Sequence, residues 1–90
     1  TPTPGELTLL IMQACGVEGR SASDEQALDA VAFAATRLKL IVEPGGAIAL
    51  AVARKHLEEL QGKTVVATLS GGNIDPAMLK AAMDRDVGLI

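Results

Sequence analysis

The stretch of residues 63–77 limits the fold of this chain more than any other part of the sequence. Residues 64–69 (TVVATL) are mostly apolar or β-branched and show no strict alternation, which is typical of a parallel strand buried on both faces. Residues 70–73 (SGGN) follow, and their glycines permit positive φ and a close approach of the backbone to a ligand. Asp75 and Pro76 then suit the N-cap and the first position of a helix. We therefore expect a central strand, a turn and a helix.

The turn at residues 70–73 is a candidate wall of a ligand site. In open α/β sheets, ligands bind outside the carboxyl ends of the strands, where this turn would lie. Ser70 is the residue that we expect to touch a ligand, and the alternative is a turn-forming serine whose hydroxyl bonds to backbone amides. A loop for nucleotide phosphates is a further alternative, but the longer glycine fingerprint and its Lys-Ser/Thr ending are missing.

The apolar content of the chain is unusual because much of it is alanine. Hydrophobic residues make up 49% of the 90 residues, yet Phe33 is the single aromatic residue. Alanine buries little area, and a short chain has difficulty burying enough surface, so we expect no self-sufficient core. A strand buried on both faces also needs neighbours for its backbone hydrogen bonds. The missing strands must come from another polypeptide or from a longer chain of which these residues are a piece.

Charge and composition argue against several classes of function. The net charge is −3, the pI is about 4.9 and the basic residues are scattered, so we expect no nucleic-acid binding. No apolar run reaches the ~18 residues of a membrane span, and no signal peptide is visible. The single Cys15 fits a reducing compartment, and we expect a cytoplasmic protein. Residues 1–4, which lack an initiator Met, and residues 87–90 read as processed, cut or frayed ends.

Four segments have the pattern of helices. The expected ranges are residues 6–14, 24–38, 44–60 and 76–84. Before the second of these, Ser23 and Gln26 match a capping box. Its buried stripe is expected to consist of Leu28, Val31, Ala32, Ala35 and Leu38. In the fourth, we expect the methionines Met78 and Met83 to pack in a core.

The third helix should begin in an interior and end in solvent. Residues 47–53 are apolar on every side, whereas those that follow are mostly polar. The unpaired amides of an interior helix start would favour an anion. His56 falls in the polar half, where we expect a structural or surface role. Cys15 is expected to be a packed thiol, and a nucleophile paired with His56 is the alternative.

Two motifs at a fixed separation carry a resemblance to a known family. They are LKLIVEPGGA at residues 38–47 and LSGGNID at residues 69–75, with PTPGELT and SDEQAL earlier in the chain. In these motifs the chain resembles the carboxyl-terminal part of the threonine/serine dehydratases, pyridoxal-phosphate enzymes of fold type II that include the serine racemases. The resemblance covers nearly all 90 residues. It implies an α/β fold in which residues 1–90 are the incomplete carboxyl-terminal segment of a large, tryptophan synthase β-like lobe, with a parallel sheet mostly supplied by residues outside the chain.

The resemblance also implies roles for three residues in binding pyridoxal 5'-phosphate. Ser70 matches the serine that hydrogen-bonds the pyridine nitrogen in this family, Gly71 follows it, and Glu43 is expected near the ring. The group at the ring nitrogen tunes the cofactor as an electron sink. A neutral hydroxyl there suits elimination of a β-hydroxyl, which yields a 2-oxo acid and ammonia. For Glu43 the alternative is a cap of the helix that starts at Pro44.

Other parts of the family's machinery are absent from this sequence. No lysine lies in the setting of the family's covalently bound lysine, and the glycine-rich phosphate cradle and the acidic metal site are missing; the lysines are Lys39, Lys55, Lys63 and Lys80. We therefore expect no catalytic or metal-binding residue here. The cofactor would be bound mainly by residues outside the chain, and the chain alone would be inactive.

The expected parent is a homo-oligomeric threonine/serine dehydratase to which this segment contributes the contact with the pyridine nitrogen. Threonine, serine and 3-hydroxyaspartate all remain candidate substrates, and racemase chemistry is an alternative reaction. From a different class, a non-catalytic interaction or regulatory module would dock its alanine-rich helices on a partner.

Overall fold

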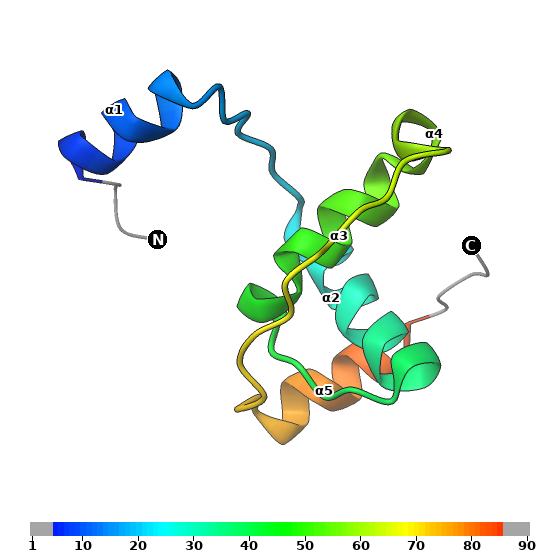
Figure 1. Ribbon diagram of the computed structural model, residues 1–90. Coiled ribbons are helices and arrows are strands. Elements are labelled where there is room, and N and C mark those ends of the chain that lie inside the picture. Colours follow the sequence, from blue (N-terminus) through cyan, green and yellow to red (C-terminus); the bar gives the residue numbers. More distant parts are fainter. Residues whose placement is uncertain (1–4, 86–90) are drawn as a thin grey trace.

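Helix α2, from Asp24 to Phe33, is the element on which most others pack in the computed structural model, which describes residues 5–85 (Figure 1). It starts with the predicted capping box. The Ser23 hydroxyl accepts a hydrogen bond from the Gln26 amide at 3.1 Å, and the Gln26 side chain accepts one from the Ser23 amide at 2.8 Å. These bonds satisfy amides that the helix start leaves free. The predicted start of this helix is confirmed.

The end of α2 widens into a π-helical turn, η1, from Ala34 to Leu38. It stops at Lys39, which has a left-handed φ of 59°. Val31 and Ala32 of the predicted stripe are buried, but Leu38 is 44% exposed. A π-helical turn holds more residues than an α-helical one and rotates the residues that follow it. The prediction for Leu38 is wrong for this reason.

The predicted helix at residues 44–60 is divided into three pieces. They are the 3-10 turn η2 (Pro44–Ala47), α3 (Ile48–Lys55) and α4 (Leu57–Leu60). The break lies at His56, whose φ of −116° and ψ of 32° are not helical. Gly46 is buried at the start, whereas α4 has no buried residue. The predicted exposed end is therefore confirmed, whereas the interior start is confirmed only in part, because Gly45, Ile48 and Ala49 are exposed.

Helix α5, from Pro76 to Met83, begins as the sequence predicts. The Asp75 carboxylate accepts a hydrogen bond at 3.0 Å from the amide two residues later. Met78 and Met83, however, are 43% and 45% exposed. The prediction that both methionines pack in a core is wrong within residues 5–85, because Ala82 and Leu79 are the α5 residues that pack in or against the described core.

The core between these helices is built mainly from alanine. Its buried members are Ala30, Val31, Ala34, Val42, Ala47, Ala51 and Ala82. The largest fully buried side chain is Val31. Since a buried methyl group contributes only ~0.8 kcal/mol, such a core supplies little free energy of folding.

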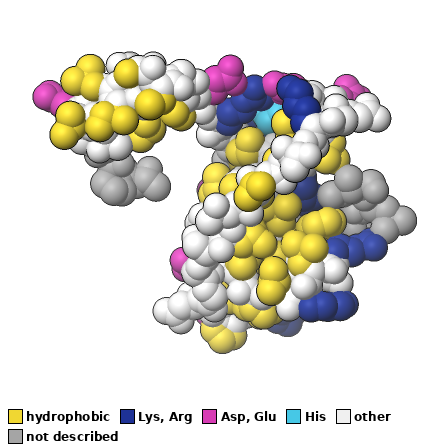
Figure 2. Space-filling model, viewed as in Figure 1, with side chains coloured by type: hydrophobic (Ala, Val, Ile, Leu, Met, Phe, Trp, Pro, Cys, Tyr) yellow, Lys and Arg dark blue, Asp and Glu magenta, His cyan; other side chains and the backbone are white. Residues whose placement is uncertain are grey.

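Helix α1, Glu6–Ala14, has its predicted bounds but buries none of its residues. It lies apart from the other helices in Figure 1, and Figure 2 shows hydrophobic side chains over its surface. Leu7 and Leu10 are 72% and 62% exposed. Cys15 is exposed too, so the prediction of a packed thiol is wrong, because nothing in the described chain packs over this end of α1.

Residues 64–69 do not form the predicted strand. No residue among 5–85 belongs to a β-ladder, and Val66 is 90% exposed. A strand requires hydrogen bonds to a neighbouring strand, which no described segment provides for residues 64–69. The prediction of a central strand buried on both faces is therefore wrong for this structure. The described residues contain the helices of the predicted α/β fold but none of its strands.

Three further predictions concern the two ends of the chain and the absence of a membrane span. The processed start at residues 1–4 and the end at residues 87–90 lie outside them. Within residues 5–85, none of the helices combines the length and the hydropathy needed to cross a membrane.

Candidate functional site

Two loops that are far apart in the sequence meet at the candidate site. The Glu43 amide donates a hydrogen bond to the Gly71 carbonyl oxygen at 2.7 Å, and the Ser70 amide donates one to the Gly46 carbonyl oxygen at 3.1 Å. The first loop leads into η2, and the second precedes α5. The structure thus brings together Ser70, Glu43 and Gly71, the three residues that the sequence predicts for the site.

Glycines make this close approach of the loops possible. A Cβ atom on Gly46 would lie only 2.5 Å from the carbonyl carbon of Ser70, so no other residue fits there without a shift of the loop. Gly71 has a φ of 73°, which confirms the predicted positive φ in this turn. A Cβ atom on Gly71 would lie 2.7 Å from Cδ of Glu43. Gly46 therefore allows the backbone of Ser70 to approach, and Gly71 allows the side chain of Glu43 to approach.

Ser70 is exposed at the tip of this junction. Its amide is bound to Gly46, but its hydroxyl forms no hydrogen bond with any residue of the described range 5–85. The turn is closed by backbone atoms instead, since the Ile74 amide donates to the Gly72 carbonyl oxygen at 3.1 Å. The alternative of a serine whose hydroxyl stabilises its own turn therefore has no support among these residues.

Glu43 lies directly before η2, with an extended backbone and a half-buried side chain. The alternative for this residue is a capping role, but its side chain makes no hydrogen bond to the amides of η2. Its carboxylate group instead lies against the α-carbon of Gly71, where it fills the space that a side chain at position 71 would occupy. Glu43 therefore contributes a carboxylate beside the turn that carries Ser70.

The junction offers the neutral hydroxyl of Ser70 and, beside the following residue Gly71, the carboxylate of Glu43. A serine hydroxyl can donate to or accept from a ring nitrogen, since it holds one proton and two lone pairs. The space beside Gly45 is open, because a Cβ there would meet no atom within 4 Å. These features fit the ring-nitrogen end of a heterocyclic cofactor.

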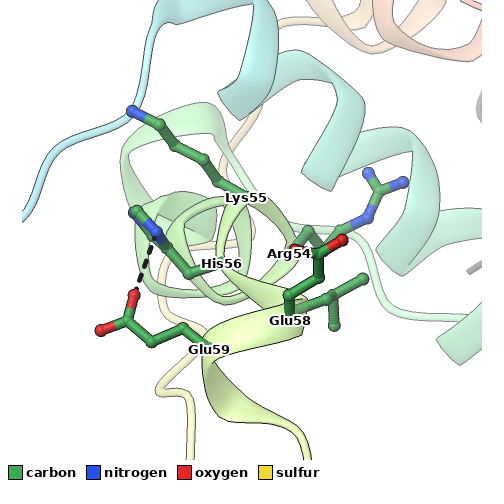
Figure 3. Close-up of a pocket in the computed structure, with 6 residues that line it drawn as sticks. Arg54, Lys55, His56, Glu58 and Glu59 are labelled. Carbon is green, nitrogen blue, oxygen red and sulfur yellow. Dashed lines mark ion pairs between the residues drawn. The ribbon is translucent and has the colours of Figure 1, made fainter.

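A separate open groove lies at the break between α3 and α4 (Figure 3). It has a volume of about 440 Å³ and is lined by Arg54, Lys55, His56, Leu57, Glu58 and Glu59. His56 Nδ1 lies 3.4 Å from a Glu59 carboxylate oxygen, and Arg20 donates to both oxygens of Glu59, at 2.8 and 2.6 Å. These contacts tie the segment before α2 to α4, which agrees with the structural role predicted for His56.

The charges in this groove stabilise one another. The hydrogen bond from Arg20 lowers the pKa of Glu59, and the hydrogen bonds to Glu59 and Glu18 raise the pKa of Arg20. Within residues 5–85, no three His, Cys, Asp or Glu residues are grouped to hold a metal ion. Cys15 lies exposed after α1 while His56 pairs with Glu59, so the alternative of a Cys15–His56 pair finds no support.

A family model described as "Pyridoxal-phosphate dependent enzyme" matches residues 1–71 of the chain. The chain belongs to this family. The match includes Glu43, Ser70 and Gly71, and it therefore covers the first loop of the candidate site and the start of the second. The family resemblance that the two motifs indicate is confirmed, whereas the roles of the three residues stay predictions.

Several named proteins are similar in sequence to this chain. It is 43% identical over 53 residues to serine racemase from Schizosaccharomyces pombe, over 59% of the chain and 16% of that relative. It is 30% identical over 82 residues to L-threonine ammonia-lyase from Thermotoga maritima, over 91% of the chain and 20% of the relative. It is 38% identical over 71 residues to L-threo-3-hydroxyaspartate ammonia-lyase from Saccharomyces cerevisiae, over 79% of the chain and 22% of that relative. The matches thus cover between 16% and 22% of the length of these relatives.

Gly46 is the residue of the loop junction that sequence reasoning missed. The available signal is the second glycine of Pro44-Gly45-Gly46, since a glycine inside a turn often marks a close approach of another backbone. The Arg20–Glu59 pair was missed as well, and it has no local signal because its partners are distant in the sequence.

Proposed function

We propose that this chain forms the wall of a pyridoxal-phosphate site that faces the pyridine nitrogen, in an ammonia-lyase acting on hydroxy amino acids such as threonine, serine or 3-hydroxyaspartate. The observation that carries the proposal is the junction of the two loops. It leaves Ser70 exposed and its hydroxyl without a partner in residues 5–85, one residue before the Gly71 beside which the Glu43 carboxylate lies. Family membership and the names of two relatives, a threonine and a hydroxyaspartate ammonia-lyase, support the assignment.

Each group of the junction has a separate task in this proposal. When bound, pyridoxal phosphate supplies an electron sink for the bonds at the α-carbon of the amino acid. The Ser70 hydroxyl holds the ring nitrogen through a neutral hydrogen bond, which leaves the ring less electron-withdrawing than a carboxylate partner would. Gly71 places no side chain between the turn and the ring. Glu43 places a carboxylate at the edge of the same site.

The rest of the site is assigned to residues outside this sequence. The covalently bound lysine, the phosphate cradle and most of the parallel sheet would come from the remainder of the parent polypeptide, so that residues 1–90 are the carboxyl-terminal part of its large domain. Two features support this division: the chain matches a small share of its relatives, and residues 64–69 have no strand partner within residues 5–85. The exposed apolar side chains of α1 and Val66 would be covered by that remainder, and we propose that the whole protein is a homo-oligomer.

Substitution of Ser70 in the full-length gene product tests this function. We expect Ser70→Asp to shift the cofactor absorbance band and to lower the release of 2-oxo acid at least about tenfold, since a carboxylate would hold the ring nitrogen protonated. Ser70→Ala should lower turnover without that change of protonation. Substitution of exposed Thr68 by Ser provides a control outside the junction. Unchanged spectrum and turnover in Ser70→Asp would refute the contact with the ring nitrogen.

A non-catalytic docking module is the second candidate, and the exposed apolar surface of α1 favours it. Sedimentation and circular dichroism of the 90-residue chain separate the two candidates. A chain that depends on the remainder of its parent should be poorly folded or self-associated, because its core is so small. A well-folded monomer that takes up no cofactor would favour the module.

A further inference from the structure

We propose that Glu43 is a positioning residue that sets the location of Ser70 by holding the neighbouring Gly71. The catalytic consequence rests on the proposed function, whereas the contact between Glu43 and Gly71 is a feature of the described chain. Two parts of Glu43 take part in it. Its amide binds the Gly71 carbonyl oxygen at 2.7 Å, and its side chain lies beside the Gly71 α-carbon.

The side chain of Glu43 occupies the space that any larger residue at position 71 would need. A Cβ atom on Gly71 would lie 2.7 Å from Cδ and 3.0 Å from Cγ of Glu43, which is well inside van der Waals contact. The carboxylate has no capping bond that would explain its orientation otherwise. Since Ser70 directly precedes Gly71, a displacement of Gly71 also displaces Ser70.

Positive φ alone does not explain why position 71 must be a glycine. Gly16 and Gly62 have φ values of 71° and 80°, close to the 73° of Gly71. A Cβ atom on either of them would meet nothing within 4 Å. Alanine at Gly62 would therefore carry the cost of positive φ alone, whereas alanine at Gly71 would carry this cost and the overlap with Glu43. Gly62→Ala thus gives the cost of positive φ, and the contribution of the Glu43 side chain is isolated by repeating Gly71→Ala in a Glu43→Ala background.

The experiment is a double-mutant cycle in the full-length gene product. We would measure the dissociation constant for pyridoxal phosphate, the cofactor absorbance band, and the melting temperature without cofactor. Gly71→Ala should weaken cofactor binding a few-fold more than Gly62→Ala, because the Glu43 side chain must move aside to admit the new methyl group. Adding Glu43→Ala to Gly71→Ala should recover most of that excess and return the absorbance band toward that of Glu43→Ala alone. Adding Glu43→Gln should recover little, because glutamine fills the same space as glutamate.

Two results would overturn the proposal: equal losses for Gly71→Ala and Gly62→Ala, or equal recovery by Glu43→Gln and Glu43→Ala. The first would show that the overlap has no effect, and the second that charge rather than shape is responsible. If the unsubstituted protein takes up no pyridoxal phosphate, the proposed function fails. The melting temperatures of the same variants then still show whether the effect of Gly71→Ala on stability depends on the side chain at position 43.

Discussion

Substitution of Gly46 by valine should separate the two loops of the site. A Cβ atom at this position would lie 2.5 Å from the carbonyl carbon and 3.3 Å from the amide nitrogen of Ser70, so the loop must move away. Overpacking of this kind costs about 1–3 kcal/mol, and loss of the hydrogen bond from the Ser70 amide to Gly46 costs about 0.5–1.5 kcal/mol. Together we expect a loss of about 1.5–4.5 kcal/mol in the free energy of unfolding.

Gly45→Val is the matched control for this substitution. Gly45 is the preceding residue of the same turn, yet a Cβ atom there would meet no atom within 4 Å. An exposed substitution of this kind should change stability by less than about 0.5 kcal/mol. In thermal unfolding of the full-length gene product, Gly46→Val should therefore lower the melting temperature by at least about 2 °C relative to Gly45→Val. Equal melting temperatures for the two variants would refute the close approach of the loops.

Three further predictions concern the strand, the helix start and the charged groove. If residues 64–69 pair with strands outside the chain, as the proposed function requires, Val66→Lys should lower the melting temperature of the full-length gene product as much as a core substitution. A Val66 that stays 90% exposed in that protein would tolerate lysine, and this result would contradict the pairing. Ser23→Ala should cost about 1 kcal/mol in denaturant unfolding, because the start of α2 loses the hydrogen bond to its hydroxyl; unchanged stability would contradict a role for the capping box. Glu59 has a pKa lowered by Arg20, so its contribution to stability is present above the ordinary pKa of glutamate, about 4.3, and is lost as the pH falls through the lowered value. Glu59→Gln should therefore flatten the loss of melting temperature between about pH 5 and pH 3, whereas Glu58→Gln, the neighbouring control, should leave the slope as it is.

Local sequence signals predict the helices well. The capping box of Ser23 and Gln26 and the Asp75-Pro76 pair mark two helix starts that the structure confirms. Glycine and proline mark the ends of α1 and the start of η2 in the same way. Such signals are reliable because the hydrogen bonds that they describe join residues within one helical turn.

Predictions that depend on distant partners were less successful. The apolar run at residues 64–69 indicates a strand, but no described segment pairs with it. Leu38 and the two methionines of α5 have core-like spacing, yet all three are exposed, Leu38 because a π-helical turn rotates it and the methionines because Leu79 and Ala82 form the packed side of α5. The pattern of a segment shows which face can be buried, while the presence of a covering element depends on the rest of the polypeptide.

The sequence by itself determined the positions of the helix starts, the two glycine-containing loops and the family to which the chain belongs. Only the tertiary structure decided that Glu43 and Gly46 of one loop bind Gly71 and Ser70 of the other, that the third helix breaks at His56, and that Arg20 pairs with Glu59. The physical reason is the range of the interactions. Caps and turns are formed by neighbours in the chain. The contact of the two loops depends instead on how helices from distant parts of the chain pack, with α3 and α5 both lying on α2.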